Sequence, residues 1–132
     1  MTDSILNSTK KLLHIDADYT EFDLDIITHI NSVFSTLNDL GIGPSDGFMI
    51  MDSDPTWADF LGDIKTLNSV KTYMVLRVRL LFDPPTNSFA ITAMQKQVEE
   101  LEYRINLYYE MAKRAGDFGD LDYDVILDGG AP

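Results

Sequence analysis

The sequence predicts an all-α protein: a small helical bundle of about four to five helices, with a long C-terminal helix and an extended C-terminal arm. Apolar residues recur at steps of three and four along residues 22–40 and 91–112, which is the spacing of one face of an α-helix. Glycine and proline residues, which stop helices, stand between the periodic segments. After residue 116 the period changes to two. We therefore expect a helical domain over residues 1–116 and an arm over residues 117–132.

The first two helices are placed by their caps. A short helix is expected from Asp3 or Ser4, either of which can cap it, to about His14. The next helix is expected to start where Asp18 and Glu21 resemble a capping box, with acidic residues at the positive end of the helix dipole. Its apolar stripe consists of Phe22, Ile26, Ile30, Val33, Leu37 and Leu40.

The middle of the chain is expected to contain a loop and a short helix. Residues 41–54 hold three glycines and a proline, so they cannot be helical throughout. Within them, residues 48–51 are expected to form either a short strand or an ordered loop. A short helix then starts at Ser53 or Asp54, with Pro55 in its first turn.

Two further helices complete the predicted bundle. Residues 64–82 are apolar nearly all round, which is typical of a central helix. Their β-branched residues leave a strand possible, but the segment is longer than a typical strand. The last helix is expected to start at a capping Ser88 and to continue to Gly116. Its apolar seam consists of Ile91, Met94, Val98, Leu101, Ile105, Tyr108 and Ala112.

The charge of the chain is large and unevenly distributed. Asp and Glu outnumber Lys and Arg by 22 to 10, for a net charge of −12. Residues 12–64 contain eleven acids and no Lys or Arg, whereas residues 65–114 carry a net charge of +3. A solvated acidic face would explain this separation. So would complementarity between copies of the chain, in which the acidic half of one subunit meets the basic segment of the next.

No pattern in the sequence indicates catalysis, a metal or a cofactor. The chain has no Cys and two His, and it lacks P-loop, dinucleotide-binding and nucleophile-elbow motifs. Asp120, Asp122 and Asp124 begin like a calcium-binding EF-hand loop, but Val125 and Ala131 occupy the positions of the required Gly and Glu. We therefore predict no catalytic residue, no cofactor and no metal site.

Composition also bears on location. The N-terminus lacks the pattern of a signal peptide, and no run of 18 apolar residues could span a membrane. Nucleic-acid binding needs clustered cations, which so acidic a chain does not offer. We expect a soluble, acidic, globular protein made in the cytoplasm.

The C-terminal segment has two interpretations. A frayed terminus is the simpler one. Its apolar content instead favours an arm that docks on this domain, a neighbour or a partner. Those apolar residues are Phe118, Leu121, Tyr123, Val125, Ile126 and Leu127.

Residues 70–110 have the sequence VKTYMVLRVRLLFDPPTNSFAITAMQKQVEELEYRINLYYE. This stretch resembles the head–tail connector family of long-tailed bacteriophages, also called adaptor or head-completion proteins. An apolar helix there breaks at Asp-Pro-Pro, and a helix with an E-x-L-E-x-R-x-N segment follows. The resemblance extends over most of residues 3–114. It implies a helical bundle without enzymatic activity. It also implies a ring, usually twelve-fold, that lies under the portal in the virion neck, extends the DNA channel and contacts the stopper or tail-terminator protein.

By this resemblance, the arm is expected to bind the portal, and double-stranded DNA passes through the ring without specific binding or any membrane contact. Acids that line a DNA channel would repel phosphates and let the genome slide. The channel-lining candidates are Asp46, Asp52, Asp54, Asp59 and Asp63. The candidates for subunit contacts are the bases Lys71, Arg77, Arg79, Lys96, Arg104, Lys113 and Arg114.

Two other hypotheses remain open from the sequence. The first is an acidic helical binding module that sequesters a basic protein or mimics the charge of DNA. The second is an enzyme or a calcium sensor, for which no residue pattern argues.

Overall fold

The protein is an all-α bundle, as predicted. The computed structural model describes residues 4–62 and 67–117, and the side chains of residues 67 and 112–117 are outside that description. Its helices are α1 (Ile5–Leu12), α2 (Asp23–Asp39), α3 (Trp57–Leu61), α4 (Leu67–Phe82) and α5 (Ser88–Asp117). The expected arm lies outside the described residues.

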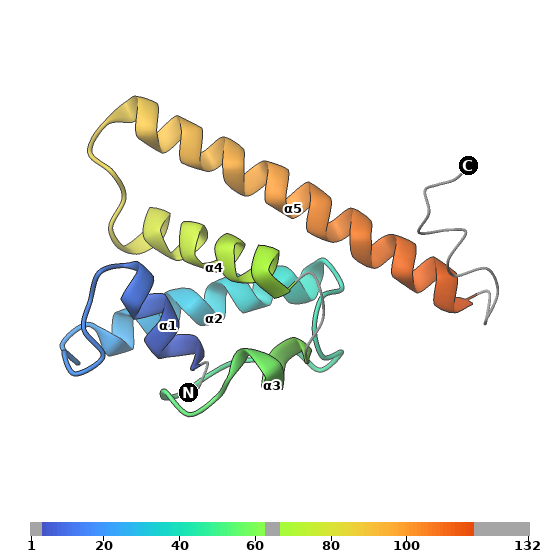
Figure 1. Ribbon diagram of the computed structural model, residues 1–132, viewed down its shortest axis with the longest axis horizontal. Helices are drawn as coiled ribbons and strands as arrows, with labels where there is room; N and C mark the ends of the chain where they lie inside the picture. The colour runs from blue at the N-terminus through green and yellow to red at the C-terminus, as the bar shows by residue number, and fades with distance from the viewer. Residues whose placement is uncertain (1–3, 63–66, 118–132) are drawn as a thin grey trace.

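Helix α4 lies at the centre of the bundle. It packs against α2 on one side and α5 on the other, and α1 contacts both α2 and α4 (Figure 1). Helices α4 and α5 run antiparallel, and α5 continues well past the start of α4 (Figure 1). The nearly all-round apolar character of residues 64–82 is therefore explained, because α4 has neighbours on both sides. Helix, rather than strand, is the correct assignment.

The core follows the predicted stripes closely. In α2 the buried positions are Ile26, Ile30, Val33, Phe34 and Leu37. In α4 they are Val70, Tyr73, Met74 and Val78, and in α5 they are Val98, Leu101 and Ile105. Phe22 of the predicted α2 stripe is 41% exposed. It lies at the edge of a surface groove rather than in the core.

The predicted capping box at Asp18 and Glu21 is wrong. Helix α2 starts at Asp23, and its N-cap residue Phe22 makes no side-chain cap hydrogen bond. A contact distant in sequence overrides the local signal, because Lys10 of α1 holds the residues before α2 in a loop. We call residues 14–22 the clamped loop.

Lys10 is fully buried and makes three bonds at the clamped loop. Its Nζ donates to the carbonyl oxygens of Ala17 at 3.1 Å and Tyr19 at 2.7 Å, and to Asp23 Oδ1 at 2.7 Å. A buried ammonium requires this complete set of partners, since an unpaired one costs several kcal/mol. The loop begins at His14, whose φ of 66° stops α1.

Three helix starts are settled by their side chains. Ser4, one of the two expected residues, caps α1 by accepting a hydrogen bond from the Asn7 amide at 3.1 Å. The expected start of the short helix at Ser53 or Asp54 is wrong, because Thr56 is the N-cap of α3. Asn87, rather than Ser88, caps α5, since its Oδ1 accepts hydrogen bonds from the amides of residues 89 and 90 at 2.7 and 3.2 Å.

Candidate interaction surfaces

Part of the predicted site falls outside the described residues. This holds for Asp63 and for all the apolar residues of the arm: Phe118, Leu121, Tyr123, Val125, Ile126 and Leu127. Lys113 and Arg114 lie on α5, but their side chains are not described. The remaining candidates fall into one acidic group and two basic groups.

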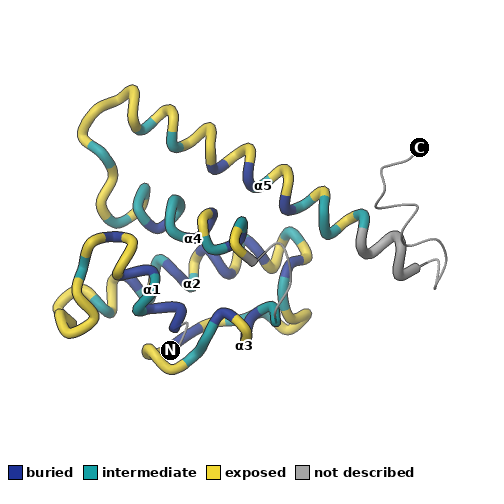
Figure 2. The backbone as a smooth tube through the Cα atoms, in the orientation of Figure 1, coloured by how far each residue is buried: buried dark blue, intermediate teal, exposed yellow. Residues whose placement is uncertain are grey.

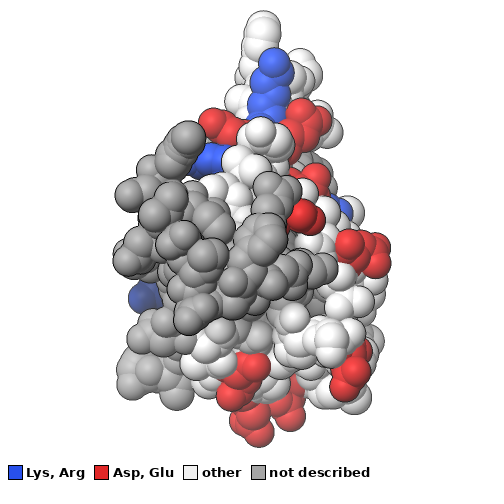
Figure 3. All heavy atoms as spheres, turned by 90° about the vertical axis from the view of Figure 1, so that its right-hand side faces the viewer, with Lys and Arg blue, Asp and Glu red and all other residues white. Residues whose placement is uncertain are grey.

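Four of the channel-lining candidates lie on one continuous segment. Asp46, Asp52 and Asp54 are exposed on the connection between α2 and α3, which we call the acidic loop (residues 44–56), and Asp59 is exposed on α3. Figure 3 faces the end of the molecule where α5 ends. Its lower edge shows Asp and Glu side chains with no Lys or Arg among the described residues. The segment therefore presents acidic charge to solvent.

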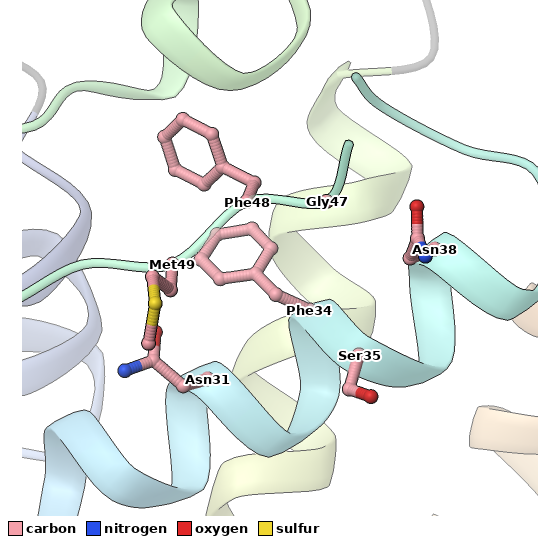
Figure 4. A pocket seen from close by; sticks show the side chains of 7 residues that line it. All are labelled: Asn31, Phe34, Ser35, Asn38, Gly47, Phe48 and Met49. Carbon is pink, nitrogen blue, oxygen red and sulfur yellow. The ribbon is translucent and has the colours of Figure 1, made fainter. Parts of the chain in front are cut away.

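The acidic loop is held firmly against α2. The side-chain amide of Asn31 donates from Nδ2 to the Ile50 carbonyl at 2.9 Å, and its Oδ1 accepts from the Ile50 amide at 2.8 Å. Nearby, the Phe34 and Phe48 rings meet edge to face with centroids 5.0 Å apart, and the Phe60 ring packs against both at tilted angles of 55° and 56° (Figure 4 shows the first two). Of the two expected alternatives for residues 48–51, the ordered loop is therefore correct, because an asparagine side chain satisfies the backbone of Ile50.

A cavity of about 230 Å³ lies beside this contact, between α2 and the acidic loop (Figure 4). Its lining includes Asn31, Phe34, Ser35 and Met49. No acid or base lines it, so the cavity offers no group for proton transfer or for charge recognition.

The acids of this segment differ in what they do locally. Asp59 belongs to the capping box of α3: its Oδ2 accepts from the Thr56 amide at 2.8 Å, while its own amide donates to Thr56 Oγ1 at 3.2 Å. Asp52 Oδ1 accepts from the Asp54 amide at 2.9 Å. The carboxylate of Asp59 therefore has a structural role that the charge pattern did not reveal.

The start of α1 fastens the far end of the acidic loop. Ser4 Oγ donates to the Ser53 carbonyl at 2.7 Å, and the Ile5 amide donates to the Pro55 carbonyl at 3.0 Å. Trp57 is buried at the start of α3, and its indole Nε1 donates to Ser8 Oγ at 2.8 Å. Both ends of the segment are therefore anchored to the first two helices.

The basic candidates on α4 make contacts within the chain. Arg77 donates to the Tyr73 hydroxyl at 2.9 Å and lies 3.8 Å from Glu102 Oε2 on α5, and the Tyr73 hydroxyl donates to the same carboxylate at 2.6 Å. Burial, followed by the hydrogen bond to Glu102, raises the pKa of Tyr73 from 10.0 to about 12. Lys71 lies 6.0 Å from the Trp57 ring centroid. Arg79 is half-buried.

The basic candidates on α5 are different, because Lys96 and Arg104 are exposed. They share the outer side of α5 with exposed apolar residues: Phe89 is 84% exposed, Tyr103 66% and Leu107 44%. Figure 2 shows that the buried positions of α5 lie in its middle, on the side toward α4. Among the described basic candidates, these two are therefore the exposed ones.

Sequence reasoning missed two features near the start of α2. One is the Lys10 contact with the clamped loop. The other is a groove of about 430 Å³ lined by Leu13, Ile15, Phe22, Phe82 and Asp83. The sequence signal for the first was a lysine inside the apolar side of a short helix, between Leu6 and Leu13. The groove brings together residues about 60 positions apart, so no local sequence pattern predicts it.

Within residues 4–62 and 67–117, no group of three or more His, Asp or Glu side chains is placed to hold a metal ion. No helix in that part of the chain is both long and apolar enough to cross a bilayer.

Comparison with known proteins identifies the family. The model of the phage connector protein family matches residues 5–112, which include all five helices except the end of α5. No curated protein and no solved structure matches the chain significantly. Because the family match covers well over half of the chain, this protein belongs to the phage connector proteins.

Proposed function

We propose that this protein forms a ring between the portal and the stopper or tail-terminator protein. Membership of the connector family, which indicates a structural role in the phage neck, supports this proposal. The ring extends the DNA channel, retains the packaged genome and lets it pass. It acts by assembly and not by catalysis, and its place is the virion neck.

The observation that carries this proposal, beyond the family, is the separation of charged surfaces. The acidic loop and α3 lie on one side of α4, and α5 with exposed Lys96 and Arg104 lies on the other (Figure 1). A ring is built from heterologous contacts, in which two different patches of the same chain meet. Lys96 and Arg104 can each pair with an acid of a neighbouring subunit, and these local pairs favour that contact although α5 as a whole carries no net positive charge.

The exposed acids also suit a DNA channel. Asp46, Asp52 and Asp54 are exposed on a loop that is tied to α1 and α2 at Ile50, Ser53 and Pro55, so Asp52 and Asp54 can present negative charge without moving. Negative charge keeps phosphates at a distance, and this allows the genome to slide. We assign the channel lining to these three acids, to Asp59 and to Asp63.

Two further assignments complete the proposal. Residues 1–116 form the connector domain, and residues 117–132 form an arm that binds the portal through its apolar side chains. The subunit contacts include Lys96 and Arg104, together with Lys71, Arg77, Arg79, Lys113 and Arg114.

Native mass spectrometry tests the proposal, with the chain alone and mixed with the portal protein. We expect a ring of 14.9 kDa subunits, either free or on the portal. High salt should weaken the ring if acid–base contacts drive association. A chain that stays monomeric with the portal and binds a basic DNA-binding protein instead would support the acidic binding module and overturn the ring.

A further inference from the structure

The groove beside the start of α2 is a defined surface feature with aromatic walls. Its lining comes from the end of α1, the clamped loop and the end of α4. Tyr19, Phe22 and Phe82 form a chain of edge-to-face rings with centroids 5.6 and 5.4 Å apart, and His29 approaches Phe82 at 6.3 Å. Tyr19 is 47% exposed and Phe22 41%. Such exposed rings would lose water-accessible apolar area on binding a partner.

The walls of the groove are fixed before any partner arrives. Lys10 holds the carbonyls of Ala17 and Tyr19 from inside the protein, and the same ammonium pairs with Asp23 at the first residue of α2. The clamped loop therefore cannot collapse into the groove without breaking buried bonds. A preformed site avoids part of the entropy cost of binding.

Acidic residues lie at the groove. Asp83 lines it, and the exposed Asp16 and Glu21 are the sequence neighbours of the lining residues Ile15 and Phe22. One exposed base, Lys11, lies close in sequence to the lining residue Leu13. Its neighbour Lys10 is buried and pairs with Asp23. An apolar groove with such a rim favours an apolar anchor flanked by positive charge.

Neither α5 nor the C-terminal residues of a second copy match these acids by net charge. On α5 the four bases Lys96, Arg104, Lys113 and Arg114 are outnumbered by Glu99, Glu100, Glu102, Glu110 and Asp117, so this helix has no net positive charge. Residues 115–132 contain five acids and no Lys or Arg. Both would meet like charge at the rim, which argues for a different protein as the occupant.

We propose that the groove between the clamped loop and the end of α4 is a docking site for a partner protein, which inserts an aromatic or leucine-sized side chain flanked by Lys or Arg. The inference rests on the proposed neck function only in taking the partner to be another virion protein. The groove itself needs no ring.

The test uses the full chain and a fluorescein-labelled peptide in which a Leu–Trp pair is flanked by two Lys on each side, with binding followed by fluorescence anisotropy. One control peptide replaces Leu–Trp by Ser–Ser and keeps the charge. A second replaces every Lys by Glu and keeps the anchor. We expect saturable binding of the first peptide, and binding weaker by roughly tenfold or more for each control.

Matched protein variants locate the site. Glu21→Lys with Asp83→Lys reverses two charges at the groove, and we expect it to weaken the peptide by roughly tenfold. Asp39→Lys with Glu110→Lys makes the same change in net charge away from the groove, because Asp39 ends α2 about 26 Å from Phe22 and Glu110 lies near the other end of α5, and it should have less than about a twofold effect. All four acids are exposed, so both variants should fold.

Three outcomes would overturn the inference: no binding of the Leu–Trp peptide, equal binding of the Ser–Ser peptide, or equal losses in the two double variants. If the chain self-associates and Glu21→Lys with Asp83→Lys abolishes that association, the groove binds a second copy of the chain. This result would also contradict the inference. Ring formation is measured separately by native mass spectrometry. If no ring forms but the peptide still binds, the proposed neck assembly is refuted and the docking site in the groove is still supported.

Discussion

The first half of the molecule and helix α5 are held in different ways. Residues 4–62 are joined by polar contacts between segments distant in sequence: Lys10 to the clamped loop, Asn31 to Ile50, and Trp57 to Ser8. Helix α5 is longer than any of those elements, yet its buried described side chains are Val98, Leu101 and Ile105, and the Tyr73–Glu102–Arg77 group ties it to α4. Polar contacts between segments are therefore more numerous in the first half of the described chain.

This contrast fits a connector. Local opening free energies vary across a protein, and elements with few buried contacts open most easily. The first half carries the acidic loop and the groove, which need fixed shapes to present charge or receive a side chain. Helix α5 carries an exposed outer side and leads to the proposed arm, so it is the element that can adjust to a neighbour.

The largest effect should come from removing the clamp. Lys10→Met leaves Asp23 and two backbone carbonyls without their buried partner, and we expect a loss of about 3–5 kcal/mol in the free energy of unfolding. Urea denaturation measures it. Lys11→Met is the matched control, because Lys11 is exposed, and it should change stability by less than about 0.5 kcal/mol. Equal effects of the two variants would mean that the clamp does not stabilise the first half.

The next effect should fall on the α4–α5 seam. Ile105 is 1% exposed, so Ile105→Ala creates a cavity and should cost about 2–3 kcal/mol. Amide hydrogen exchange should show α5 losing protection while α2 keeps most of its own. If both helices lose protection equally, the molecule unfolds as one unit and the contrast between the two regions is wrong.

A pH effect of about 1.4 kcal/mol between pH 9 and pH 11 should come from Tyr73. Its pKa is about 12 in the folded protein and 10.0 in the unfolded chain, so between pH 10 and 12 the unfolded state binds fewer protons. The contribution is complete below pH 10 and is lost as pH rises through 12. Denaturation at pH 9 and pH 11 measures this loss, and Tyr73→Phe should reduce it. An unchanged pH dependence in Tyr73→Phe would contradict the assignment.

The smallest effect should appear on the outer side of α5. Phe89 is 84% exposed, so Phe89→Ser should change thermal stability by less than about 0.5 kcal/mol. A loss above about 1 kcal/mol would show that this side chain packs within the subunit. Ile91→Ser is the contrasting variant, because Ile91 lies on the half-buried side of the same turn and should cost more.

The sequence predicted the fold well because burial imposes a period on the helices. Ile26, Ile30 and Val33 had to recur every three or four residues to face α4, and that spacing is visible without a structure. The start of α2 was not predictable in this way. It depends on an ammonium group supplied by Lys10, thirteen positions before Asp23.

For the candidate surfaces, the sequence predicted the charge but not the contacts within the chain. The exposed positions of Asp46, Asp52 and Asp54 agree with a solvated acidic segment, but their position in a ring remains a prediction. The contacts of Arg77 with Tyr73 and Glu102 depend on how two helices pack, and spacing within either helix does not encode that. The groove likewise exists only because the clamped loop and the end of α4 meet in space.

The overhang of α5 has a mechanical consequence. Beyond Tyr109, which packs half-buried against the core, α5 continues for eight residues to Asp117, or about 12 Å. If α5 pivots about its seam by about 10°, its end moves by about 2 Å, while the core of α1, α2 and α4 stays in place. The contact between α4 and α5 is then the pivot. In the proposed ring, the ends of α5 would adjust to neighbouring subunits while the packed core keeps its shape.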